Sequence, residues 1–157
     1  MTAQDPLDDP DLDEPFDLDE DEADEEEDPE VPELVFASVD EWFRSYWRFS
    51  YRRRVSGKGS GTGRWSATWW EKDEALQRLT ALWRGWEAAR QDPALGTSAW
   101  WINHADPHMN ALLSLDGPFA GSQDENLPGE PLPYRRPPTG LFDADRQPAG
   151  IYDDAEY

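Results

Sequence analysis

Hydrophobic side chains recur with helical spacing directly after an acidic, apolar-poor N-terminal stretch. At 100° per residue, the apolar side chains of residues 39–53 fall on one broad face, as in an amphipathic helix. They are Val39, Trp42, Phe43, Tyr46, Trp47 and Phe49. Ser38, with Glu41 three residues later, has the spacing of a capping box and predicts where the helix begins. The glycine-rich run 57–63 ends the pattern and predicts a flexible linker.

A second helix is predicted over about residues 71–91. Its shared apolar face consists of Ala75, Leu79, Leu82, Trp83 and Trp86. Pro93 and Gly96 end this helix, and Thr97 or Ser98 then caps a short third helix that includes His104. Asp106-Pro107 is expected to restart the chain as a fourth short helix, because proline suits a first helical position and disfavours helical geometry just before it. After Gly117-Pro118, Phe119 is expected to fold back onto the bundle.

These elements predict a mainly α fold, a small three-to-four-helix Trp-rich bundle over residues 38–122. All nine tryptophans lie in this stretch, and each buried indole removes roughly 150–250 Å² from water. Nine rings are more than one small core hides completely. Adjacent helical residues point about 100° apart, so at least one ring of each tandem pair, Trp69-Trp70 and Trp100-Trp101, is expected at the rim. Such a rim marks an interaction surface, the alternative being a ragged outer layer of the core.

The flanking segments are predicted to be disordered tails, residues 1–37 and 123–157. The first holds 18 acidic residues and no Lys or Arg, which gives a net charge of −18. The central domain has a net charge of +2 and the second tail −5. Few apolar groups and strong self-repulsion argue against folding of the first tail. Five prolines in residues 128–138 favour extended backbone in the second, which is either a flexible tail or a short linear motif.

Composition also limits compartment and chemistry. The chain has no cysteine, so neither a disulfide framework nor a thiolate metal site is expected. No apolar run approaches the roughly 18 residues that span a bilayer. The acidic N-terminus is the reverse of the basic start of a signal peptide. A cytoplasmic protein without membrane insertion is the expectation.

Arginine gathers on the face of the first helix opposite its apolar side. Arg44, Arg48 and Arg52 form a row at i, i+4 spacing, where like charges repel unless an external anion relieves them. Three interpretations remain open: a solvated face, docking of an acidic tail or protein, and contact with nucleic acid. The predicted partner-binding residues are Arg44, Arg48, Arg52, Arg53, Arg54, Trp69, Trp70, Trp100 and Trp101.

Catalytic chemistry has few candidates in this sequence. His104 and His108 stand four residues apart with Asp106 between them, a spacing at which helical histidines can share a metal ion. The alternative is that Asp106 caps a helix while the histidines pack on tryptophan rings. Gly57–Gly63 lacks the ending of a phosphate-binding loop. No nucleophile with a base partner is evident, so a protein without enzymatic activity or cofactor is predicted.

A resemblance rests on several short motifs in fixed order over about residues 35–122. They are Trp65-x3-Trp69-Trp70, Glu74-Ala75, Ala81-Leu82-Trp83-x2-Trp86-Glu87-x2-Arg90, Ser98-x-Trp100-Trp101, His104-x-Asp106-Pro107-His108 and Gly117-Pro118-Phe119. Together they resemble an uncharacterised actinobacterial family of Trp-rich domains of unknown function, often encoded on plasmids and integrative elements beside conjugation or type IV secretion genes. Relatives place cysteines near positions 66 and 122 and a histidine near 72. This chain has Ser66, Ser122 and Lys72, so a metal or thiol role in those relatives is not implied here.

The resemblance implies a genomic neighbourhood but no biochemical activity. Combined with the residues, it predicts a cytoplasmic accessory or adaptor protein of a mobile element. Its Trp and Arg surface would bind a protein partner, such as a conjugation or type IV secretion component, and its acidic tail would tune that contact. The alternative is a nucleic-acid-binding accessory protein autoinhibited by the same tail.

Overall fold

Three helical segments form the framework of the described part of the chain, which in this computed structural model comprises residues 32–59 and 61–142. The first consists of α1 (Val39–Trp42), η1 (Phe43–Trp47) and α2 (Arg48–Ser50). The second is α3 (Asp73–Ala89), preceded by the 3-10 turn η2 (Trp69–Glu71). The third consists of α4 (Gly96–Trp100), η3 (Trp101–Ala105) and α5 (Asp106–Leu113). The predicted mainly α, Trp-rich fold is confirmed, and these described residues contain no β-strand.

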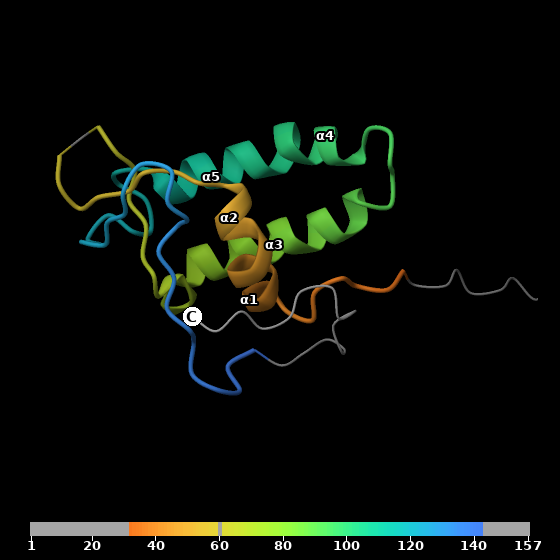
Figure 1. The fold of residues 1–157 in the computed structure, drawn as a ribbon, viewed down its shortest axis with the longest axis horizontal. Coiled ribbons are helices and arrows are strands. Elements are labelled where there is room, and N and C mark those ends of the chain that lie inside the picture. Colours follow the sequence, from red (N-terminus) through yellow and green to blue (C-terminus); the bar gives the residue numbers. More distant parts are fainter. Residues whose placement is uncertain (1–31, 60, 143–157) are drawn as a thin grey trace, which may run out of the picture. The chain divides into compact units, whose positions relative to one another are not determined.

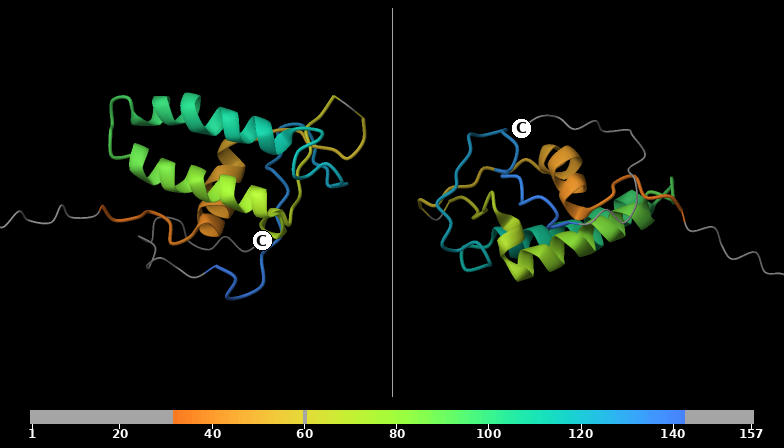
Figure 2. Two further views of the ribbon diagram at one scale, coloured as in Figure 1. Left: turned by 180° about the vertical axis from the view of Figure 1, so that it is seen from behind. Right: turned by 90° about the horizontal axis from the view of Figure 1, so that it is seen from below.

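The helices lie in two layers. The α3 helix and the α4–η3–α5 segment lie side by side in opposite directions, joined by a short connection (Figure 1). The α1–η1–α2 segment crosses one face of this pair, and the chain after residue 123 runs along the same side (Figure 2). Each amphipathic helix thereby buries its apolar face against the other layer.

The first helix begins where the capping box predicts. The Oγ atom of Ser38 accepts a hydrogen bond from the backbone N–H of Glu41 at 3.1 Å. The Glu41 carboxylate in turn accepts the N–H of Ala37 at 2.6 Å, one residue earlier than the usual reciprocal bond. Two donors at the helix start are therefore satisfied by side chains, although both acids of this turn, Asp40 and Glu41, are buried.

Two segments, η1 and η3, are π-helical and widen the helix by one residue per turn. The second of them overturns the predicted break at Asp106-Pro107. The helix continues from Gly96 to Leu113, with Pro107 in the first turn of α5 and Asp106 inside the helix rather than at an N-cap. An α-helix would press the proline ring against the carbonyl four residues earlier. The wider η3 turn relieves this clash, so one long helix replaces the two predicted short ones.

The N-terminus of this long helix also differs from the prediction. Neither Thr97 nor Ser98 caps it, because the helix already begins at Gly96 after Leu95. A side chain in the preceding turn takes over part of that role. The Oδ1 atom of Asp92 accepts the backbone N–H of Ala94 at 2.9 Å. The connection is thus ordered by a side chain-to-backbone turn that substitutes for a capping residue.

The core consists largely of aromatic rings. Six tryptophans are buried, namely Trp42, Trp47, Trp65, Trp69, Trp83 and Trp100. Trp47 stacks on Trp42 at 5.3 Å between ring centroids and meets Trp100 edge-on at 5.3 Å. Phe119 is buried against Trp65 at 4.9 Å, so the predicted return of the chain at this residue is confirmed. Ring packing of this kind adds favourable edge and stacking contacts to the burial of apolar area.

The domain extends beyond the predicted C-terminal boundary at residue 122. Residues 123–142 pack on the helices, and the side chain of Leu132 is fully buried. Backbone atoms secure the segment on two sides: Leu132 N–H donates to the carbonyl of Arg48, and Arg135 N–H donates to that of Ala67 at 2.9 Å. The prolines favour an extended backbone, as expected, but tertiary contacts hold it in place. The predicted disorder of this stretch is therefore wrong for residues 123–142.

The N-terminal boundary also lies earlier than predicted. Phe36 is fully buried, and Glu87 on α3 accepts the N–H groups of Val35 at 3.0 Å and Phe36 at 3.0 Å. Arg90 donates to the same carboxylate at 2.8 Å and also to the carbonyl of Glu33. A buried acid with backbone donors and an arginine partner thus fixes residues 33–36 to the helical pair. The predicted disorder of the remaining tail residues, 1–31 and 143–157, concerns positions outside the described residues.

Candidate functional site

Two members of the predicted arginine row, Arg44 and Arg48, are structural. The Nε atom of Arg44 lies 3.5 Å from Asp40 Oδ2, and only 14% of its side chain is exposed. Arg48 donates from Nε to the carbonyl of Leu132 at 2.9 Å. The C-terminal segment covers this face of the helix, so the solvated or partner-binding interpretation does not hold for these two residues.

A buried carboxyl beneath this cover joins the C-terminal segment to the first helix. The hydroxyl of Tyr134 donates to Asp40 Oδ1 at 2.7 Å. Burial raises the pKa of Asp40 above its usual value, and the Tyr134 hydrogen bond and the Arg44 charge oppose that rise. Burial, reinforced by the Asp40 carboxyl, likewise raises the pKa of Tyr134. The pair is a cross-link between residues 94 positions apart.

The next three arginines, Arg52, Arg53 and Arg54, are exposed. Arg52 donates from Nη1 to the carbonyl of Gly129 at 2.9 Å. The guanidinium of Arg53 lies 4.1 Å from the ring centroid of Tyr51, a cation–π contact. None of the three has a carboxylate partner within residues 32–59 and 61–142. Three positive charges therefore lie next to one another in sequence at the surface, and none forms an ion pair with an acid in the part of the chain that the structure describes.

Each tandem tryptophan pair divides between core and rim, as predicted. Trp69 and Trp100 are buried, and the indole N–H of Trp100 donates to the carbonyl of Leu82 at 3.1 Å. Trp70 and Trp101 are partly exposed. Trp70 donates to the carbonyl of Arg135 at 3.1 Å. Of the four predicted rings, the two buried ones contribute to the core, and only the two outer ones offer a face to a partner.

Of the two outer rings, Trp101 is the one that lies near Arg53, whereas Trp70 contacts Arg135. Trp101 stacks on Tyr51 with ring centroids 6.1 Å apart, on the ring that Arg53 covers. Two exposed apolar residues are next in sequence to residues of this region: Ile102, 67% exposed, follows Trp101, and Leu127, 65% exposed, follows Asn126. Asn126, just before Leu127, donates to the carbonyl of Arg53 at 2.9 Å. We define the basic surface as Arg52, Arg53, Arg54, Trp101, Ile102 and Leu127.

The corrected boundaries change the charge balance of the domain. Residues 33–142 contain 13 acidic residues and 13 Lys or Arg, so the folded part is neutral rather than slightly basic. Residues 1–32 contain 17 acids and no Lys or Arg. The folded part therefore has no net positive charge, and attraction of an anion must come from local groups such as Arg52, Arg53 and Arg54.

The predicted metal candidates are not arranged around a common point. His104 and Asp106 are exposed, while His108 lies with Nδ1 3.1 Å from Nη1 of Arg78. Burial, the Arg78 charge and His104 together lower the pKa of His108, which favours a neutral imidazole that accepts from the guanidinium. The alternative in which Asp106 caps a helix is wrong, because Asp106 lies inside the continuous helix. Within the described ranges, no three His, Cys, Asp or Glu side chains are grouped as for a metal ion.

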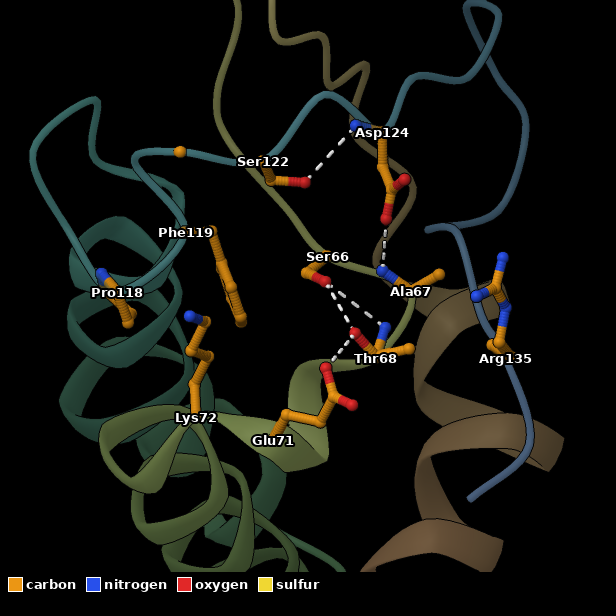
Figure 3. A pocket seen from close by; sticks show the side chains of 11 residues that line it. Ser66, Ala67, Thr68, Glu71, Lys72, Pro118, Phe119, Ser122, Asp124 and Arg135 are labelled. Carbon is orange, nitrogen blue, oxygen red and sulfur yellow. Dashed lines mark hydrogen bonds between the residues drawn. The ribbon is translucent and has the colours of Figure 1, made fainter. Parts of the chain in front are cut away.

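A pocket of about 360 Å³ was not predicted from the sequence. Its walls come from residues 66–72, residues 118–124 and Arg135, three segments that meet at the start of α3 (Figure 3). Phe119 and Pro118 line one end, and Lys72 extends into the hollow beneath them (Figure 3). Positions 66, 72 and 122, singled out only through the resemblance, all line this pocket. Their separation in sequence hides their proximity, and this chain has neither thiol nor imidazole at any of them.

Hydrogen bonds order the polar wall of the pocket. Ser66 Oγ and Thr68 Oγ1 are 3.2 Å apart, and Thr68 donates onward to Glu71 Oε2 at 2.8 Å. Across the pocket, Asp124 Oδ2 accepts the N–H of Ala67 at 2.7 Å, and Ser122 donates to the carbonyl of Trp65 at 2.6 Å. Both carboxylates therefore already accept internal donors.

Comparison with known families finds one family, and no activity has been assigned to that family. A family model described as a domain of unknown function, DUF4913, matches residues 36–138, which coincides with the folded domain and includes the C-terminal segment. No curated protein matches the chain. No solved structure matches it either.

Proposed function

From the premise that the chain belongs to the DUF4913 family, we propose that this protein is a non-enzymatic adaptor whose basic surface binds an acidic segment of a protein partner. The observation that carries the proposal is the stack of the Arg53 guanidinium and the partly exposed Trp101 on Tyr51, with the exposed Arg52 and Arg54 next to Arg53 in sequence. Arginine and tryptophan are the residue types that contribute most to protein interfaces.

The chemistry of the surface defines the partner. Carboxylates of the partner would pair with Arg52, Arg53 and Arg54. Apolar side chains spaced among those carboxylates would contact Ile102 and Leu127. An acidic peptide with isolated hydrophobic residues supplies both. The chain's own residues 1–32, with 17 acids interrupted by Leu12, Phe16 and Leu18, have this composition. We therefore propose that this segment competes with the partner and tunes its affinity.

The genomic setting implied by the resemblance suggests where to search for the partner. A cytoplasmic component of a conjugation or type IV secretion system would be the first candidate. The described helices include none long and apolar enough to cross a bilayer.

The test is affinity capture from the native host with three baits. They are the full chain, a chain lacking residues 1–31, and the full chain with Arg52, Arg53 and Arg54 replaced by Gln. The deletion is expected to capture more of the same partner, and the triple variant less. Lys58→Gln, an exposed cation in the neighbouring loop, is the matched control and should leave capture unchanged. If the deletion changes neither capture nor its salt dependence, the competition by residues 1–31 is refuted.

A second candidate function is binding of single-stranded nucleic acid. The stack of Arg53, Tyr51 and Trp101 is the specific observation in its favour, because aromatic and guanidinium faces accept unpaired bases. The neutral domain and the tethered acids oppose it. Salt-sensitive binding of an oligonucleotide by the chain lacking residues 1–31 would favour this function over the adaptor role.

A further inference from the structure

We propose that the pocket between residues 66–72 and 118–124 binds the oxyanion group, phosphate or carboxylate, of a small polar molecule. The pocket lies apart from the residues that define the basic surface, so this inference does not depend on the proposed adaptor role. Its volume of about 360 Å³ falls within the range of small-molecule sites.

The charged side chains that line the pocket favour an anionic ligand over a cationic one. Lys72 and Arg135 are its two cations, and neither side chain has a hydrogen bond or a carboxylate partner within residues 32–59 and 61–142. The two acids, Glu71 and Asp124, have internal donors in Thr68 and Ala67. Neither acid is paired with a cation of the pocket, so Lys72 and Arg135 remain available to an arriving anion. An arriving cation must compete with the internal donors of Glu71 and Asp124.

The position of Lys72 indicates where in the pocket the anion would bind. Its side chain extends into the hollow toward Pro118 and Phe119, whereas Arg135 lies at the opposite rim (Figure 3). The hydroxyl of Ser66 faces the same hollow. Because Thr68 gives its proton to Glu71, the proton of Ser66 can be donated either to Thr68 or to a ligand. Lys72 and Ser66 together offer a charge and a directed donor to one oxyanion.

The walls favour a polar remainder of the ligand. Phe119 is only 1% exposed. The hydroxyls of Ser66, Thr68 and Ser122 line the pocket together with the charged side chains already named. Three chain segments build the pocket. Two of them are held at a fixed separation by the hydrogen bond that Ser122 donates to the Trp65 carbonyl and by the one that Asp124 accepts from the Ala67 N–H. A pre-formed site of this kind requires little reorganisation on binding.

The experiment is titration of the full, ¹⁵N-labelled chain with inorganic phosphate and, separately, with acetate, followed by amide chemical shifts. We expect saturable binding of at least one anion, with shifts at Ser66, Thr68 and Ser122. The anion that saturates at the lower concentration identifies the ligand group. Lys72→Gln should weaken binding at least about tenfold, and Arg135→Gln about threefold.

Lys58→Gln removes an exposed lysine outside the pocket and serves as the matched control. It should leave the affinity unchanged. The proposal is overturned if neither anion saturates, if the shifts occur at residues 52–54 instead, or if the Lys72 and Lys58 variants lose affinity equally. Lys72 is exposed, so its variant should retain the wild-type spectrum elsewhere and report on binding alone.

Discussion

Replacing Glu87 by alanine should detach residues 33–36 from α3 and destabilise the whole domain. The carboxylate is 5% exposed and accepts from Val35 N–H, from Phe36 N–H at 3.0 Å and from Arg90 Nε at 2.8 Å. A buried donor left without a partner costs about 1–3 kcal/mol. The Phe36 N–H bears this cost in full, the part-buried Val35 N–H bears less, and Arg90 regains water because its side chain is 27% exposed. The sum is about 2–4 kcal/mol.

Urea unfolding of the full chain measures this loss directly. Glu74→Ala on the same helix is the matched control, because Glu74 forms an exposed ion pair with Arg78 at 3.1 Å. Such a pair contributes at most about 1 kcal/mol. Amide exchange at Phe36 should accelerate in the Glu87 variant and remain slow in the Glu74 variant. Equal unfolding midpoints for the two variants would show that Glu87 does not hold the N-terminal segment.

Three further predictions concern the C-terminal segment and the Asp40 carboxyl that it contacts. Leu132→Ala, at a fully buried side chain, should lower the free energy of unfolding by about 2–5 kcal/mol, whereas Leu127→Ala, 65% exposed, should change it by less than about 0.5 kcal/mol; urea midpoints compare them. The raised pKa of Asp40 means that the folded protein binds this proton more readily than the unfolded chain. Its contribution to stability is present below the unfolded value of 3.8 and is lost as pH rises through the folded pKa, so Asp40→Asn should remove that fall from the pH profile of the unfolding midpoint. Tyr134→Phe removes the hydrogen bond that lowers the pKa of Asp40, so the carboxyl resonance of Asp40 should titrate at higher pH than in the wild type.

Local patterns in the sequence were sufficient for most of the fold. Helical periodicity predicted the first two helices to within three residues at each end, and the capping spacing predicted the bond from Ser38 to Glu41. The geometric limit on adjacent tryptophans predicted that at least one ring of each tandem pair would lie at the rim, as Trp70 and Trp101 do. These are short-range rules, and they operate before any tertiary contact is known.

The predictions that were wrong share one cause: each depends on tertiary contacts that local sequence patterns do not indicate. Pro107 was predicted to interrupt the helix, because the sequence does not indicate the π-helical turn at Trp101–Ala105 that accommodates the proline. The C-terminal segment was predicted to be disordered because its composition is polar and proline-rich. One buried leucine and a few backbone hydrogen bonds nevertheless hold it against the helices. That segment also removes Arg44 and Arg48 from the predicted surface. The pocket is formed by segments about 50 residues apart, a proximity that no local pattern encodes.

The most direct measurement of the central proposal maps an acidic ligand onto the domain. A peptide with the sequence of residues 5–33 would be titrated into a ¹⁵N-labelled chain beginning at residue 32. We expect amide shifts around residues 51–54, 101–102 and 127, which weaken as salt rises and vanish when Arg52, Arg53 and Arg54 are replaced by glutamine. Shifts confined to the pocket, or none at saturating peptide, would contradict it.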